Sequence, residues 1–322
     1  MPANEESHVR YKDLEIPSFP FLKIFQPQET HFSIQNAFCL ACCAQLAYLE
    51  PEVIKRRVID DWGFTEFEFY DREGTQAFLA ASDETIIVSF RGTEPPNLAD
   101  WMTDFDFKLV PGPAGKVHSG FSKALSFVWR RILKKIRSIR SASVVDLQTM
   151  SRGDGKKAGR PANQTVPTLW ITGHSLGAAL ALLATAEMKL LEDRPVRGLY
   201  TFGQPRTGNQ DFARDFNSVF KERAFRFANN NDVVTRVAPR LLGYSHTGSI
   251  YYIEHDGKIR PDINRWEQFL DRLQGRFDDF LDVMHGNLIP DGIEDHNMVK
   301  GYIPAIQKNL APEVQKLIQN AA

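Results

Sequence analysis

A serine between two glycines, in the sequence GHSLG, is the residue of this chain best suited to nucleophilic chemistry. Ser175 lies between the apolar stretches TLWITG and LGAALALLATA, so the sequence predicts a strand, a sharp turn and a helix. Gly173 and Gly177 flank His174, Ser175 and Leu176, and their lack of a β-carbon lets strand and helix approach closely. The alternative interpretation is an ordinary strand-to-helix turn in which the serine caps the helix.

Two backbone groups are candidates for stabilising the oxyanion of an ester hydrolysis. The helix that begins after Ser175 directs the N–H of Leu176 and its positive dipole end toward the place where such a charge would form. Upstream, the predicted strand TIIVSF runs into RGTE, where Thr93 can supply a second donor. A plain β-turn is the alternative at this second position.

A serine hydroxyl needs a histidine to take its proton and a carboxylate to orient that histidine. Asp232 follows the predicted strand AFRFANN, at a strand end where site residues of such sheets gather, although NNND also forms turns without any chemistry. Asp211 and Asp215 are weaker candidates because both fall on a predicted helix.

The histidine cannot be chosen from spacing alone, since four follow Asp232. These candidates are His246, His255, His285 and His296. His296, in IEDHNMVKGYI, is the last of them.

A short stretch after Thr93, PPNLADWMTDF, carries apolar residues at helical spacing. They are Leu98, Trp101, Met102 and Phe105. The stretch is interpreted either as a lid that turns its apolar face to a lipid surface or as plain core.

These residues must be positioned by alternating strands and helices. A helix is predicted over about 31–49, strands follow in DWGFTEFEFY, TQAFLAAS and ETIIVSF, and further strands and helices surround Ser175. This pattern predicts an α/β fold with a mostly parallel sheet flanked by helices. We expect a single domain over 1–322, with a polar extension at about 1–20, a polar surface loop at about 141–167 and a helical insertion at about 258–293.

Composition limits the partners. With Lys+Arg 39 and Asp+Glu 40 the net charge is -1, so the overall charge does not favour binding to nucleic acid, and the basic helix near 120–140 is interpreted as a solvated face.

Cys39, Cys42 and Cys43 fit a buried helix better than a metal site with His31, and neither a metal nor another cofactor is expected. No membrane-spanning stretch or secretory signal is evident, which favours the cytoplasm, or secretion if a leader is missing.

Taken together, seven segments resemble the fungal-type, or class 3, lipase family of α/β-hydrolases. The segments are TQAFLAASDETIIVSFRGTE, WMTD, VHSGF, ITGHSLGAALALL, TFGQPRTGN, NDVVTRVAP and DHNMV. The resemblance implies Ser175, Asp232 and His296 as catalytic triad, Thr93 and Leu176 as oxyanion donors, and a lid over about 94–105. It also implies that His118 and Gly120 line the site region.

The resemblance implies hydrolysis of acylglycerols, most directly of triacylglycerols. A phospholipase A1, a monoacylglycerol lipase or a soluble carboxylesterase would use the same residues, and a noncatalytic lipid-binding protein is a remote alternative. The chain departs from secreted fungal members in lacking disulfides, and the aromatic residue that often closely follows their histidine is displaced to Tyr302. His285 therefore stays an alternative base.

Overall fold

The computed structural model describes residues 16–17, 19–93, 106–151, 166–192, 194–230, 232–238, 240–261 and 295–321. Side chains are described for all of these except residues 144–151, 236 and 241.

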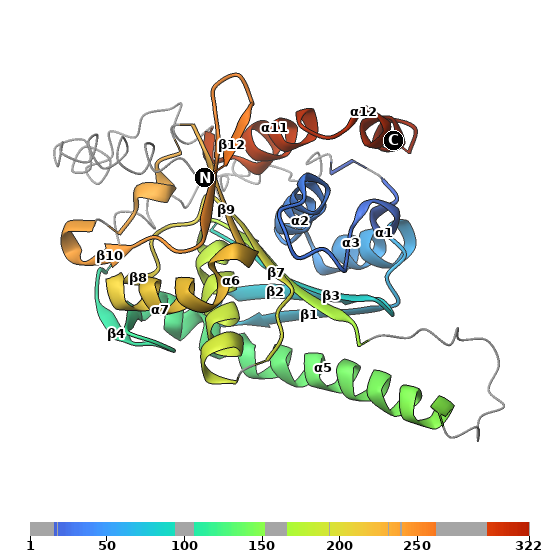
Figure 1. The fold of residues 1–322 in the computed structure, drawn as a ribbon, viewed down its shortest axis with the longest axis horizontal. Helices are drawn as coiled ribbons and strands as arrows, with labels where there is room; N and C mark the ends of the chain where they lie inside the picture. The colour runs from blue at the N-terminus through green and yellow to red at the C-terminus, as the bar shows by residue number, and fades with distance from the viewer. Residues whose placement is uncertain are drawn as a thin grey trace, which may run out of the picture.

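The core of the fold, in the part of the chain that the structure describes, is a sheet of eight strands in the order β1-β2-β3-β6-β7-β9-β11-β12 (Figure 1). Neighbouring strands from β3 to β11 are parallel, whereas β1, β2 and β12 are antiparallel to their neighbours. The strands are β1 Glu66–Arg72, β2 Thr75–Ala81, β3 Thr85–Phe90, β6 Thr168–His174, β7 Gly198–Phe202, β9 Ala224–Asn229, β11 Ser249–Ile253 and β12 Ile259–Pro261.

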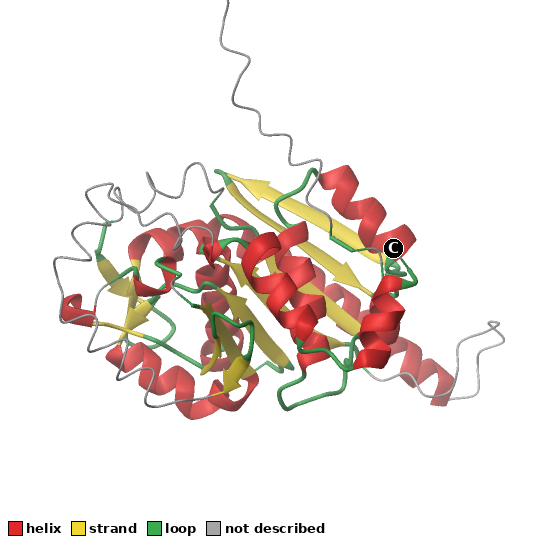
Figure 2. Cartoon of the chain, turned by 90° about the horizontal axis from the view of Figure 1, so that it is seen from above, coloured by secondary structure: helices red, strands yellow, loops and turns green. Residues whose placement is uncertain are grey.

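Helices cover both faces of this sheet, as the view from above shows (Figure 2). One face packs against α5 Ser119–Ser151, α6 Leu176–Ala186 and α7 Gln210–Phe220. The other packs against α1 Phe21–Ile24, α2 Ile34–Leu46, α3 Pro51–Arg56, α11 Ile303–Lys308 and α12 Pro312–Gln319. The predicted fold, an α/β-hydrolase with a mostly parallel sheet between helical layers, is confirmed.

Helix α2 is buried along most of its length, which fits its mostly apolar sequence. Its N-cap, Ser33, accepts a hydrogen bond from the Asn36 N–H, and residues 36–46 are all buried. Cys39, Cys42 and Cys43 lie in this segment as free thiols within the core, where the sequence placed them. The hydroxyls of Ser89 and Thr172 donate to α2 carbonyls, which ties the helix to β3 and β6.

Short π and 3-10 turns extend or link several of these elements. They are η2 Arg57–Asp61, η3 Glu187–Leu191, η4 Lys221–Arg223, η5 Val234–Arg236, η6 Arg240–Leu242 and η7 Met298–Tyr302.

A second, antiparallel sheet was not predicted from the sequence. Its order is β10-β8-β5-β4, with β10 Tyr244–Ser245, β8 Gly208–Asn209, β5 Lys116–His118 and β4 Leu109–Pro111. Strands of two or three residues are too short to produce a recognisable alternation of side chains.

The predicted loop at 141–167 is wrong at its beginning, because α5 continues to Ser151 and extends beyond the body of the molecule (Figure 1). An established helix adds a backbone hydrogen bond with each further residue, so it can continue after its packing face ends. The predicted insertion at 258–293 begins instead with β12, and residues 262–294 lie outside the described part.

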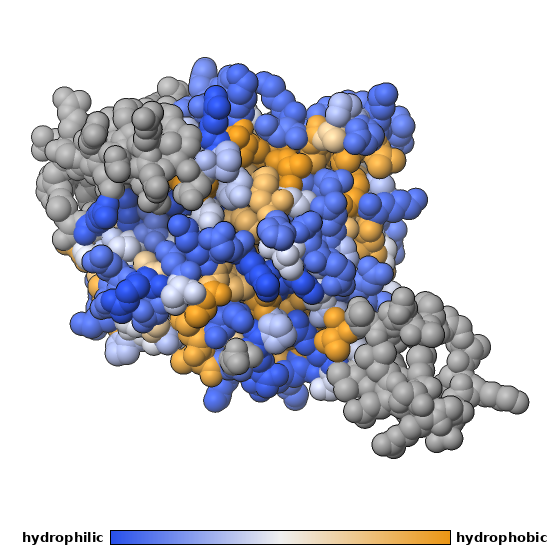
Figure 3. All heavy atoms as spheres, viewed as in Figure 1, coloured by the Kyte–Doolittle hydropathy of each residue, from blue (hydrophilic) through white to orange (hydrophobic). Residues whose placement is uncertain are grey.

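The face of the molecule in Figure 3 is mostly hydrophilic, with apolar patches between the charged side chains. Among the helices that the structure describes, none is long and apolar enough to cross a membrane.

Candidate active site

Ser175 lies in a sharp turn between β6 and α6, at φ 58° and ψ −128°. A side chain is rarely tolerated at this positive φ, so the turn must be held by its surroundings. The Ser175 N–H donates to the Phe202 carbonyl (3.0 Å), and the Ser175 carbonyl accepts from the Ala178 N–H (3.0 Å). These bonds fix the turn between two strands and the helix.

The Ser175 hydroxyl does not cap the helix. It makes no capping hydrogen bond, and the buried Oγ has no hydrogen-bond partner among the described residues. A serine at a helix start ordinarily caps the helix, but Ser175 does not. Its hydroxyl is therefore available to react.

Both glycines of the elbow stand where a β-carbon would collide with backbone. A β-carbon on Gly173 would lie 2.3 Å from the Gly177 carbonyl oxygen, and one on Gly177 would lie 2.2 Å from the Phe90 carbonyl oxygen. The close crossing of β6, α6 and β3 thus depends on glycine at both positions.

His296 and Asp232 form a buried pair. Both carboxylate oxygens of Asp232 lie 2.9 Å from His296 Nδ1. A carboxylate only accepts hydrogen bonds, so Nδ1 carries the proton and the lone pair of a neutral ring is on Nε2. His296 Nε2 is buried and has no hydrogen-bond partner within the described structure. This is the tautomer that a general base requires.

Asp232 is held from two further directions. Its Oδ1 accepts from the Val234 N–H (2.9 Å), and its Oδ2 accepts from the hydroxyl of Tyr302 (2.5 Å). Tyr302, noted in the sequence only as a displaced aromatic, therefore reaches the carboxylate from η7.

Gly203, just after β7, brings the serine turn next to this pair. A β-carbon there would lie 2.6 Å from His296 Cε1 and 2.8 Å from Asp232 Oδ2. The carbonyl of the preceding residue, Phe202, accepts a hydrogen bond from the Ser175 N–H. Phe202 and Gly203 thus contact Ser175 and His296 in turn. Gly203 was not predicted as a site residue, because its only signal in the sequence is a glycine directly after a strand.

The two candidate oxyanion donors line one groove. Thr93 follows β3, and Leu176 is the first residue of α6. A β-carbon on Gly92 would lie 3.0 Å from Ser175 Cβ, so this loop passes beside the serine. A groove of about 360 Å³ is lined by Gly74, Thr75, Gln76, Arg91, Gly92, Thr93, Leu176 and Leu180.

The alternative candidates for the acid and the base have other environments. Asp211 and Asp215 lie on α7 with exposed side chains that pair with Arg214. His255 is exposed, and burial together with Arg226 and Arg206 lowers the pKa of His246 well below 6.5. His285 and the four lid residues Leu98, Trp101, Met102 and Phe105 lie outside the described residues.

His118, which the family resemblance places near the site, is the last residue of β5. Its Nε2–H donates to the Asp106 carbonyl, and its Nδ1 accepts from the Phe121 N–H (3.3 Å). Burial lowers its pKa, so the ring is neutral near pH 7. Gly120 lies beside it, because a β-carbon there would be 2.9 Å from His118 Cε1. This histidine fixes the chain at Asp106.

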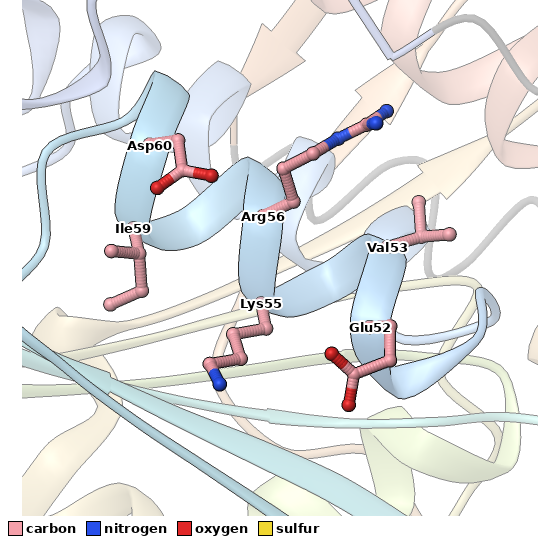
Figure 4. A pocket seen from close by; sticks show the side chains of 6 residues that line it. All are labelled: Glu52, Val53, Lys55, Arg56, Ile59 and Asp60. Carbon is pink, nitrogen blue, oxygen red and sulfur yellow. The ribbon is translucent and has the colours of Figure 1, made fainter.

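A second hollow lies on α3 and η2 (Figure 4). It is lined by Glu52, Val53, Lys55, Arg56, Ile59 and Asp60. All six come from one stretch of helix, and none is a candidate for the chemistry described above. We assign this hollow no role.

Comparison with known proteins finds similarity to lipases. The family model for lipase (class 3) matches residues 87–242. Triacylglycerol lipase OBL1 of Ricinus communis is 31% identical over 253 residues, which cover 65% of this chain and 48% of that protein. Secreted mono- and diacylglycerol lipase 1 of Fusarium solani is 32% identical over 190 residues, which cover 57% of this chain and 49% of that protein. The chain thus spans about half the length of the curated relatives it matches.

Among solved structures, a lipase from Rhizopus microsporus var. chinensis has the same fold. It superposes with a TM-score of 0.51 at 24% identity, over 77% of this chain and 83% of that chain.

Proposed function

We propose that this chain is a class 3 lipase that hydrolyses carboxylic esters of acylglycerols, with triacylglycerols as the main substrate; the match of residues 87–242 to that family model supports the proposal. The observation that carries the proposal is the pairing of Asp232 with Nδ1 of His296, together with a buried Nε2 of His296 and a buried Oγ of Ser175 that both have no partner in the described structure. These are the two atoms between which the reaction must move a proton.

In the proposed acylation step, Ser175 Oγ attacks the ester carbonyl while His296 Nε2 takes the hydroxyl proton. The oxyanion accepts hydrogen bonds from the backbone N–H groups of Thr93 and Leu176. His296 then returns the proton to the alcohol oxygen as the carbon–oxygen bond breaks. Asp232 stabilises the imidazolium and keeps the productive tautomer.

In the proposed deacylation step, water attacks the acyl-enzyme. His296 accepts a proton from the water, the tetrahedral intermediate collapses, and the proton returns to Ser175 Oγ as the fatty acid leaves. Water and ester are the only reactants, so the residues named above account for every proton that moves.

The number of acyl chains on the preferred glyceride is a finer question. One relative is a triacylglycerol lipase and another a mono- and diacylglycerol lipase, so the partial glycerides are the second candidate substrates. The groove beside Thr93 and Leu176 is also lined by Arg91 and Gln76, whose side chains hydrogen-bond to each other, so part of its lining is polar.

The test compares initial rates on emulsified tri-, di- and monoacylglycerols and on p-nitrophenyl butyrate and palmitate. We expect Ser175→Ala to abolish hydrolysis and labelling by a fluorophosphonate, whereas Ser126→Ala, which alters an exposed serine on α5, should retain both. Hydrolysis of the butyrate ester alone would indicate a carboxylesterase. If wild type and Ser175→Ala are equally inactive on every ester, the proposal is wrong.

A further inference from the structure

The imidazole of His174 lies between Tyr48 and His296. Its Nε2–H donates to the main-chain carbonyl of His296 (2.7 Å), and the Tyr48 hydroxyl lies 2.8 Å from its Nδ1. All three side chains are buried. The rings of His174 and His296 have centroids 4.3 Å apart and an interplanar angle of 34°.

These contacts fix the tautomer of His174. A carbonyl can only accept, so Nε2 carries the proton and Nδ1 must accept from the Tyr48 hydroxyl. Burial, followed by the proximity of His296, holds the pKa of His174 well below 6.5, so the ring is neutral near pH 7. The hydrogen bonds therefore run in one direction, from Tyr48 through His174 to the His296 main chain.

This chain of hydrogen bonds links the two halves of the proposed reaction. His174 is the residue before Ser175, and its ring holds the backbone of His296. Asp232 holds the same histidine by its side chain. His296 is thus fixed at two points, one of which is built directly onto the serine turn.

Tyr48 is itself well fixed. It lies just after α2, which is tied to the sheet through the hydroxyls of Ser89 and Thr172. A β-carbon on Gly92 would lie 2.2 Å from the Tyr48 hydroxyl oxygen, so Tyr48 also supports the loop that leads to Thr93. Tyr48, which lies outside the matched family segment 87–242, therefore reaches the site.

We propose that Tyr48 and His174 are positioning residues that set the distance between Ser175 Oγ and His296 Nε2. This inference rests on the proposed hydrolase function. A neutral His174 ring against His296 has a second consequence, because His296 becomes positively charged during the reaction. A neutral ring avoids the repulsion that a second imidazolium would cause.

The experiment measures kcat and KM on soluble p-nitrophenyl butyrate, and the rate of fluorophosphonate labelling, for Tyr48→Phe, His174→Gln and His174→Leu. His174→Leu removes both hydrogen bonds, and we expect kcat and the labelling rate to fall about 100-fold, the cost of a misplacement of about 1 Å, with little change in KM. Tyr48→Phe removes one bond, and we expect a fall of about five- to tenfold.

His174→Gln serves as the conservative rescue. Its amide N–H can reach the His296 carbonyl and its amide oxygen can accept from Tyr48, so we expect at least tenfold higher kcat than in His174→Leu. In the double variant Tyr48→Phe/His174→Leu the losses should not multiply, because both changes break the same chain of hydrogen bonds. Nitrogen-15 NMR of the wild type should show His174 with its proton on Nε2.

Tyr200→Phe is the matched control. It removes a buried hydroxyl on the same side of the sheet, one that bonds to the Ser33 backbone rather than to the site. We expect it to lower the unfolding temperature but to leave kcat unchanged. If Tyr48→Phe and the His174 variants likewise lower only the unfolding temperature and stay within twofold of wild-type kcat, the positioning role is wrong. An inactive wild type would instead contradict the proposed function.

Discussion

The hydroxyl of Tyr302 donates to Asp232 Oδ2 over 2.5 Å, although 70 residues separate the two in the chain. The same hydroxyl accepts from the Asn229 N–H (3.1 Å), so Tyr302 joins the end of β9 to the carboxylate that follows it. With its bonds to Val234 and His296, the carboxylate of Asp232 accepts from a backbone amide, a phenol and an imidazole.

Tyr302→Phe is expected to lower both stability and activity. Loss of a hydrogen bond to a charged group should cost about 1.5–3 kcal/mol in the free energy of unfolding. Because Asp232 then has more freedom to turn away from His296, kcat should fall about tenfold. Urea unfolding and p-nitrophenyl butyrate kinetics measure the two effects. An unchanged kcat in a destabilised variant would show that Val234 and His296 alone orient the carboxylate.

Gly203→Ala should abolish most of the activity. The added methyl would stand 2.6 Å from His296 Cε1 and 2.8 Å from Asp232 Oδ2, so the pair must separate, and a loss of about 100-fold or more in kcat is expected. The positive φ of 58° adds a backbone cost of about 1–2 kcal/mol.

The control for this backbone cost is Gly243→Ala. Gly243 has φ 85°, and a β-carbon added there would meet nothing within 4 Å, so the variant carries the strain without the collision. It should lose only the backbone cost of about 1–2 kcal/mol and keep wild-type kcat. Equal activity of the two variants would mean that the site accommodates a methyl at residue 203.

The parts of the site that the sequence predicted are those that depend on neighbours in the chain. The elbow at Ser175 needs only a strand, two glycines and a helix in order, and Asp232 needs only the end of a strand. The choice of His296 among four histidines came from the family resemblance. The contacts of Tyr302, Gly203 and Tyr48 could not be predicted, because each joins segments far apart in sequence and depends on the register of the completed sheet.

The three cysteines should be unreactive in the folded protein. Cys39, Cys42 and Cys43 are buried in α2, and burial raises the pKa of each thiol, so the thiolate that reacts with disulfide reagents is scarce. With a chromogenic disulfide at pH 8, we expect no fast reaction of the native protein and three thiols per chain in 6 M guanidinium. A rapidly reacting native thiol would mean that α2 opens readily from the sheet.

Stability should decrease as the pH falls below about 6.5, before carboxylates titrate. Burial lowers the pKa of His118, His174 and His246 below the ordinary value of 6.5, so the unfolded chain binds protons first as the pH falls. The three neutral histidines therefore stabilise the folded protein fully above pH 6.5, and this stabilisation is lost as the pH falls toward their pKa values in the folded protein. The free energy of unfolding falls by up to about 1.4 kcal/mol per pH unit for each group.

Urea unfolding at pH 7.5, 6.5 and 5.5 measures this slope. His174→Gln removes one of the three groups and should make the slope shallower, whereas His255→Gln, at an exposed position, should leave it unchanged. A free energy of unfolding that stays constant from pH 7.5 to 5.5 would mean that these rings become protonated without leaving the core, and His174 could then not be the neutral link between Tyr48 and His296.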